Sequence, residues 1–186
     1  MRELVKLFAQ ISVLRRGPQD LPASLALLVL TLLAYCTLNL LLNYLLPAPA
    51  AAADAGAVTE IEPGSWAAQL LLDTVFTLLW YVALLRLAGK AERTLQTTTA
   101  VFGFQIVLAP LFALSTWLLP RFLHDSTFGV PVTLFSVVML VWLVAANSHI
   151  VRAALEWSAG ASVALVILQI LAAELLRRGL FPAAAA

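Results

Sequence analysis

The chain has 186 residues and a formal net charge of +1, with 62% hydrophobic and only 11% charged residues. A soluble domain carries charged side chains at about a quarter of its positions, so this composition excludes an ordinary soluble fold and, with its near-neutral charge, a general nucleic-acid binder. We therefore expect one membrane domain over residues 1–186, in which helices pair the backbone polar groups because lipid offers no hydrogen bonds.

Residues 1–16 are predicted to form an amphipathic helix that lies in the membrane interface. Apolar side chains recur there at helical spacing, opposite Arg2, Lys6 and Gln10. The apolar positions are Leu4, Leu7, Phe8, Ile11 and Leu14. Gly17 and Pro18 then end this helix and turn the chain.

Five long apolar segments follow, and each approaches or exceeds the roughly 20 residues that a helix needs to cross the hydrocarbon core. The predicted spans are residues 21–46, 66–87, 98–119, 131–151 and 159–176. This pattern predicts an all-α, polytopic membrane bundle with five transmembrane helices and one interfacial helix. A cleavable signal peptide is the alternative for the first span, but the apolar regions of signal peptides have only about 7–15 residues.

The longest predicted loop runs from Pro47 to Ser65 and is rich in Ala and Pro. It contains no Lys or Arg, and its acidic residues are Asp54, Glu60 and Glu62. The tail from Ala183 to Ala186 is expected to be unstructured.

The basic residues favour one orientation of the spans. With a cytoplasmic N-terminus and five crossings, three of the 11 Lys and Arg residues lie outside and the others lie inside, as the positive-inside rule requires. The outer three are Arg121, Arg177 and Arg178. The alternative is a re-entrant last segment with a cytoplasmic C-terminus, since that segment is short. High Ala and Leu content and short loops suit a bacterial inner membrane.

Polar side chains recur four residues apart inside the first two spans, so each set shares one helix face. The first span carries Tyr35, Asn39 and Asn43, and the second carries Gln69, Asp73 and Thr77. With one acid of the fifth span, the candidate intramembrane cluster comprises Asn39, Asn43, Gln69, Asp73, Thr77 and Glu174. These residues form either a proton- or ion-coupled site or a hydrogen-bonding seam between helices. The seam is favoured, because the sequence offers Asp73 no second core acid and no obvious cation.

Pro110 is the candidate bend of the third span, because a proline inside a helix frees a backbone carbonyl. A packing bend is favoured over a hinge. Ala109 and Ala113 form a small-residue pair that lets two helices approach closely. Arg152 and Glu156 stand four residues apart and are expected to form a local ion pair.

The chain carries no recognisable motif for catalysis, cofactor binding or metal binding. It lacks a Walker-type Gly-rich loop, a G-x-S-x-G sequence and an H-E-x-x-H sequence. A lipid-modifying enzyme would depend on His149 with Glu156, but these residues lie about 10 Å apart along a continuous helix. We therefore expect a non-enzymatic protein without a cofactor or metal.

The order of these features resembles the Yip1-like family of small membrane proteins, which have a cytoplasmic N-terminal segment, a proline-marked first span and five closely spaced helices. The stretch Leu14-Arg15-Arg16-Gly17-Pro18-Gln19-Asp20-Leu21-Pro22 also resembles the start of uncharacterised proteobacterial inner-membrane proteins. The resemblance implies a non-enzymatic role in membrane organisation, trafficking or assembly of partner proteins.

Two functions remain open. The leading hypothesis is a scaffold or assembly factor that binds other membrane proteins or lipids, either with a membrane-protein partner or as a homo-oligomer, and that does not bind nucleic acid. The loops are too short to build a soluble active site, whereas polar stripes and small-residue pairs favour contacts between helices. The alternative is a small transporter or channel subunit that uses the Asp73 stripe.

Overall fold

The computed structural model describes residues 2–46 and 63–181, which are mostly helical, with no strand among them. The elements in chain order are α1 (Arg2–Ser12), η1 (Pro18–Asp20), α2 (Leu25–Leu45), α3 (Pro63–Leu87), η3 (Ala91–Arg93), α4 (Thr94–Phe122), α5 (Gly129–Leu155) and α6 (Ala159–Leu180). The predictions for the acidic loop at residues 47–62 and for the tail at residues 183–186 lie outside the described residues.

Five of the described helices are long and apolar enough to cross a membrane, which confirms the predicted all-α bundle. Their apolar stretches are Leu25–Leu45, Trp66–Leu87, Ala91–Phe122, Gly129–Leu155 and Ala159–Leu180. Many large apolar side chains on these helices are exposed; Leu33 and Leu175, for example, expose 61% and 71% of their surface. Such exposure is costly in water and favourable in lipid, so this is the fold of an integral membrane protein.

The helix ends differ from the predicted spans by a few residues. α2 begins at Leu25 rather than at residue 21, because the hydroxyl of Ser24 accepts a hydrogen bond from the Leu27 amide at 3.3 Å and so caps the helix. α4 and α6 extend past their predicted ends, to Phe122 and Leu180. The last helix therefore has 22 residues, enough to span the hydrocarbon core.

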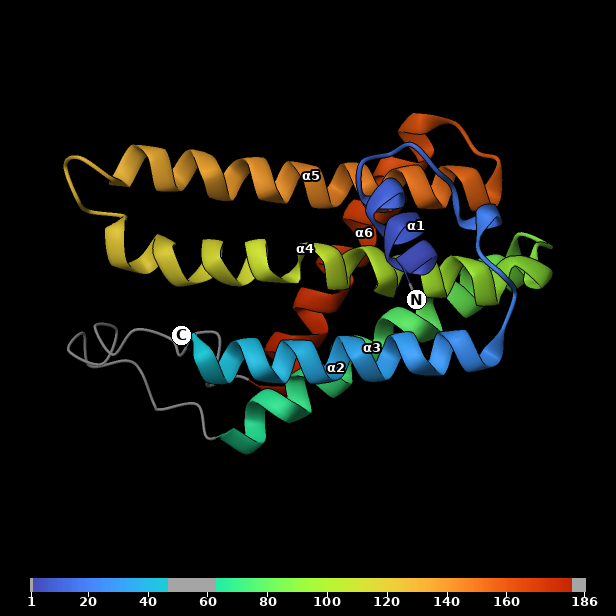
Figure 1. The fold of residues 1–186 in the computed structure, drawn as a ribbon, viewed down its shortest axis with the longest axis horizontal. Helices are drawn as coiled ribbons and strands as arrows, with labels where there is room; N and C mark the ends of the chain where they lie inside the picture. Colours follow the sequence, from blue (N-terminus) through green and yellow to red (C-terminus); the bar gives the residue numbers. More distant parts are fainter. Residues whose placement is uncertain (1, 47–62, 182–186) are drawn as a thin grey trace.

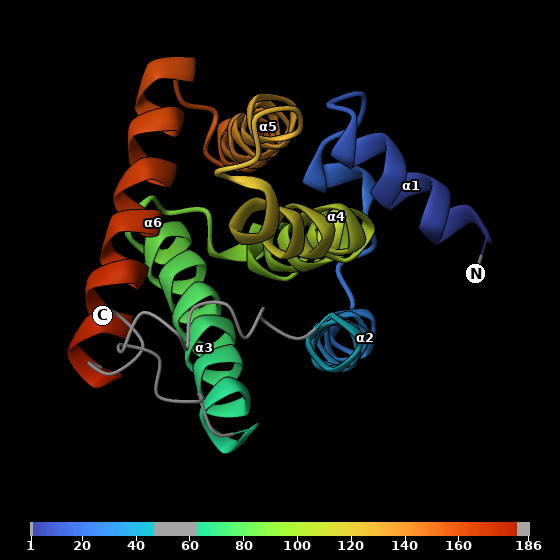
Figure 2. The ribbon, with the colours of Figure 1, turned by 90° about the vertical axis from the view of Figure 1, so that its left-hand side faces the viewer.

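α4 is the central helix of the bundle. α2, α4 and α5 run along a common direction in Figure 1 and are seen end-on in Figure 2, with α4 between the other two. α3 and α6 run obliquely to these three helices on one side of α4, and α1 lies on the opposite side. Every residue from Thr97 to Phe104 is buried, because α4 packs against α1, α2, α3 and α5. The core therefore surrounds the first half of α4.

The amphipathic helix α1 packs directly on α4 and α5. Its apolar face contributes the fully buried Ile11, with Leu7, Phe8 and Leu14 against the same core. A Cβ atom on Gly103 of α4 would lie only 2.2 Å from the Phe8 ring. The absence of a side chain at Gly103 therefore lets α1 approach α4.

Three side chains of the bundle hold the chain around and after α1 by hydrogen bonds to its backbone carbonyls. Trp142 donates from Nε1 to the Ser12 carbonyl at 2.9 Å, and His149 donates from Nε2 to the Arg16 carbonyl at 3.1 Å. Gln96 donates from Nε2 to the Leu21 carbonyl at 2.7 Å. These bonds satisfy carbonyls that the turns of this segment leave without helical partners.

One end of the bundle carries a group of cations on α3, η3 and α5, and we call it the basic end. Its members are Arg86, Lys90, Arg93 and Arg152. The sequence predicted an ion pair between Glu156 and Arg152, but Glu156 instead binds Lys90 at 2.8 Å and Arg93 at 2.7 Å. The expected pair is wrong because Glu156 leaves the helix in a left-handed conformation, with φ of 62°. Its carboxylate instead joins the loop after α5 to the loop before α4.

Replacing Gly103 with Ala is expected to lower the thermal stability of the protein in detergent. The new methyl group would overlap the Phe8 ring, and overpacking of this kind typically costs about 1–3 kcal/mol. Gly160→Ala is the matched control, because nothing lies within 4 Å of the Cβ position there, and it should be neutral or slightly stabilising. Equal melting temperatures for the two variants would contradict the close packing of α1.

The ion pairs of Glu156 predict a pH-dependent contribution to stability. Hydrogen bonds from Lys90 and then Arg93 to the ionised carboxylate hold the pKa of Glu156 below its ordinary value. The stabilisation is therefore complete above the unfolded-state pKa of about 4.3 and is lost as the pH falls through the lowered folded-state pKa. The melting-temperature gap between the wild type and Glu156→Gln should close over that range. Glu92→Gln, at a nearby carboxylate, should show no such gap at any pH.

Candidate functional site

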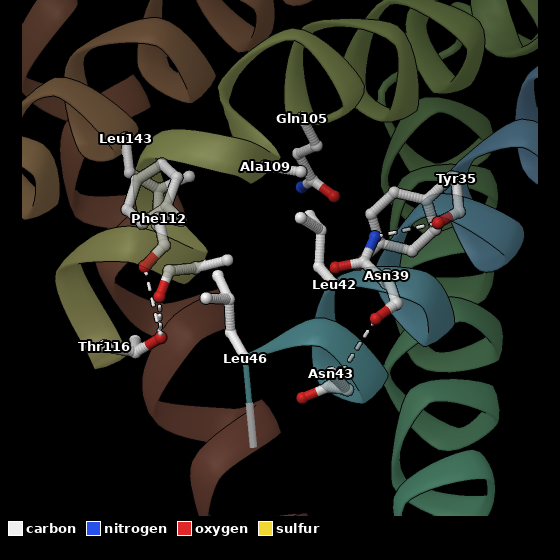
Figure 3. A pocket seen from close by; sticks show the side chains of 11 residues that line it. Tyr35, Asn39, Leu42, Asn43, Leu46, Gln105, Ala109, Phe112, Thr116 and Leu143 are labelled. Atoms are coloured by element: carbon white, nitrogen blue, oxygen red, sulfur yellow. Dashed lines mark hydrogen bonds between the residues drawn. The ribbon is translucent and has the colours of Figure 1, made fainter. Parts of the chain in front are cut away.

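A cavity of about 360 Å³ lies between α2 and α4 in the half of the bundle away from the basic end (Figure 3). We call it the α2–α4 cavity. Its polar lining consists of Tyr35, Asn39, Asn43, Gln105 and Thr116. Its apolar lining consists of Leu42, Leu46, Ala109, Phe112, Ala113 and Leu143. The two helices therefore enclose a mixed polar and apolar space within the membrane-spanning part of the protein.

Helical spacing brings these side chains to the cavity. The stripe of Tyr35, Asn39 and Asn43 on α2, expected from the sequence, turns towards α4. On α4, Gln105 and Ala109 stand four residues apart and so share the facing side of that helix. The small side chain of Ala109, like that of Ala113, leaves space between the helices where larger residues would fill it. The small-residue pair thus lines a cavity here.

The polar groups of the cavity are incompletely paired. Asn39 donates from Nδ2 to the Tyr35 carbonyl at 2.8 Å, and Asn43 donates to the Asn39 carbonyl at 3.0 Å. The side-chain oxygens of Asn39 and Asn43 accept no hydrogen bond from another described residue. The amide of Gln105 neither donates nor accepts one among the described residues. Figure 3 shows the amides of Asn39 and Gln105 directed into the space between the helices. Asn39 and Gln105 are half-buried and Asn43 is exposed, so these groups stay accessible to a polar occupant of the cavity that could pair with them.

The rest of the predicted cluster lies elsewhere, where α3 packs against α6. Asp73 of α3 lies within electrostatic range of Glu174 and Arg177 of α6, and also of Tyr35. Glu174 accepts hydrogen bonds from Arg177 and, at 2.7 Å, from Arg178. Arg177, which was assigned to the flank after the last span, therefore pairs with Glu174.

The six predicted residues are thus divided between two places. Asn39 and Asn43 line the α2–α4 cavity, whereas Asp73 and Glu174 lie at the contact of α3 with α6. Gln69 has a buried Nε2 with no partner among the described atoms, and Thr77 is partly buried on the same helix. Tyr35 lines the cavity, and its ring packs edge-to-face on Phe102 of α4, with 5.2 Å between the ring centroids.

Two further sequence expectations concern α4 and metal binding. α4 continues as a helix through Pro110, the candidate bend, whose side chain is exposed beside the cavity. Within residues 2–46 and 63–181, no three His, Cys, Asp or Glu side chains are grouped so that they could hold a metal ion. Gln105 and Thr116 were not among the predicted site residues, because single polar residues in a span carry no periodic signal.

Comparisons with known proteins add no family to this picture. No family model matches the chain, no curated protein matches it, and no solved structure matches it. The resemblance to the Yip1-like family therefore stays a prediction.

The unpaired amide of Gln105 predicts that Gln105→Leu raises the melting temperature of the purified protein in detergent. The change removes a polar group that has no partner among the described residues, and whose desolvation costs about 1–3 kcal/mol. Gln96→Leu on the same helix is the control; it should lower the melting temperature, because Gln96 donates to the Leu21 carbonyl. Destabilisation of equal size by both substitutions would show that Gln105 is paired.

Proposed function

We propose that the chain is a non-enzymatic protein of the bacterial inner membrane that acts as a scaffold or assembly factor, with a membrane-protein partner bound at the α2–α4 cavity. The observation that carries the proposal is the set of polar groups without a partner among the described residues, namely the side-chain oxygens of Asn39 and Asn43 and the amide of Gln105, in a cavity between membrane-spanning helices. Helices in membranes associate through close packing and through polar side chains that hydrogen-bond across the contact. A partner helix with one polar side chain would satisfy both requirements.

The size of the cavity supports a helix face as the occupant. About 360 Å³ accommodates a few side chains rather than a whole helix. The lining combines apolar groups such as Leu42 and Phe112 with amide groups, as expected at a contact that is both packed and hydrogen-bonded. A second copy of the chain could supply that face as well as a different protein, so the test below separates them.

The proposed orientation places the basic end in the cytoplasm and the C-terminus outside. The concentration of Arg86, Lys90, Arg93 and Arg152 at one end supports this orientation through the positive-inside rule. At the other side, Glu174 pairs with Arg177 and Arg178 and so offsets the positive charge that this topology places outside. Reporter fusions at Gly89, at Asp125 and at the C-terminus test the orientation directly.

A photo-crosslinking amino acid placed at Ala113, inside the cavity, is expected to give one discrete protein adduct in native membranes. The same group at Leu114, which is exposed on another face of α4, should react with lipid instead. An Ala109→Phe change, which fills the cavity, should abolish the adduct at position 113 without unfolding the protein. Mass spectrometry of the adduct distinguishes a second copy of the chain from another protein. Identical adducts at both positions, or none at position 113, would contradict the scaffold function.

Transport through the bundle is the second candidate, and it depends on Asp73. The observation that favours it is an acidic side chain, Asp73, inside the membrane-spanning part of α3, a helix that packs against α6. Acidic side chains inside spans are costly and commonly mark ion or proton pathways. This candidate requires Asp73→Asn to abolish a proton- or ion-dependent flux in proteoliposomes. If the protein is a scaffold instead, Asp73→Asn should leave the photo-crosslinked adduct at position 113 unchanged.

A further inference from the structure

A second hollow lies at the basic end, in the wedge where α6 crosses α5 obliquely (Figures 1 and 2). It has a volume of about 490 Å³ and adjoins another of about 340 Å³, with His149 and Arg152 lining both. We call the two together the α5–α6 wedge. The wedge is separate from the α2–α4 cavity, with which it shares no lining residue.

The deeper part of the wedge is apolar and open to the surroundings of the bundle. It is lined by Leu140, Val141 and Val144 of α5 and by Val163 of α6. Leu140 and Val141 expose 54% and 62% of their surface, so this part faces lipid rather than the protein core. From Leu140 to Arg152, α5 rises about 18 Å, which exceeds half of the roughly 30 Å hydrocarbon thickness. The wedge as a whole, from its apolar end at Leu140 to its polar end at Arg152, therefore has the depth of one leaflet.

The other part of the wedge is polar and carries uncompensated positive charge. Arg152 is exposed and forms no ion pair with a described residue, because Glu156 is bound by Lys90 and Arg93. Glu156 also lines the wedge, but Lys90 and Arg93 neutralise it from outside the lining, so the Arg152 guanidinium is left without a counter-charge among the described residues. His149 is oriented by its Nε2 hydrogen bond to the Arg16 carbonyl, which leaves Nδ1 free. Trp157 borders the same space with 41% of its surface exposed, as tryptophan often does at a membrane interface.

We propose that the α5–α6 wedge binds one anionic phospholipid from the leaflet at the basic end. The phosphate group accepts hydrogen bonds from the Arg152 guanidinium, and an acyl chain follows α5 towards Leu140. Charge complementarity selects the occupant: a groove of leaflet depth, apolar at Leu140 and ending in the guanidinium of Arg152, matches a lipid with a negative headgroup. The inference rests on the membrane location in the proposed function, but not on the scaffold role or its partner.

The test compares lipids bound to the purified protein by native mass spectrometry in neutral detergent. Wild-type protein should retain phosphatidylglycerol in preference to phosphatidylcholine of the same chain length. Arg152→Gln should reduce that preference about tenfold, the effect of losing one charge-assisted hydrogen bond. Arg86→Gln is the matched control, because Arg86 is an exposed cation at the same end that does not line the wedge. If both variants lost the preference for phosphatidylglycerol equally, general surface charge would explain the preference, and the proposal would be overturned.

Two further variants keep the result decisive if Arg152→Gln folds poorly. Arg152→Lys should keep a measurable preference for the anionic lipid, because it keeps the charge. Ala145→Trp should weaken retention of both lipids, because it fills the apolar part and leaves the charges in place. A site for phosphate alone would instead show the wild-type preference in Ala145→Trp and an equal thermal shift with inorganic phosphate. The photo-adduct at position 113 should persist in Arg152→Gln, so failure of the lipid site and failure of the scaffold function are distinguishable.

Discussion

Lipid offers no hydrogen bonds, and the architecture of this protein follows from where its polar groups find partners. Around the first half of α4, three carbonyls of the N-terminal segment find partners within the chain, in the side chains of Trp142, His149 and Gln96. This pairing allows a non-helical stretch to lie against the core. Between α2 and α4, polar side-chain groups at the cavity have no hydrogen-bond partner among the described residues. This makes the α2–α4 cavity our candidate for an intermolecular contact.

The sequence predicted correctly those features that depend on a single helix. Span positions follow from the length of apolar runs, and the amphipathic face of α1 follows from residue spacing. The stripe of Asn39 and Asn43 was likewise visible, since side chains four residues apart must share a helix face. Caps such as Ser24 moved the helix ends by only a few residues.

The partners of those faces could not be predicted, because they depend on how the helices cross. The oblique course of α3 and α6 brings Asp73 near Arg177, whereas parallel helices would have supported one shared cluster with Asn39. Glu156 is a second case: one left-handed residue redirects its carboxylate from Arg152 to Lys90 and Arg93. Neither the tilt of a helix nor a single backbone turn leaves a periodic trace in the sequence.

The hydrogen bond from Trp142 to the Ser12 carbonyl joins residues that are 130 positions apart in the chain. α1 leaves the ribosome before α4 and α5, which together form its docking surface. During that interval its apolar face has only the membrane interface to cover it. The amphipathic character of α1 therefore suits both stages of its existence, first as a peripheral segment and then as part of the folded bundle. The docking of α1 on α5 therefore cannot precede the synthesis of residues 129–155.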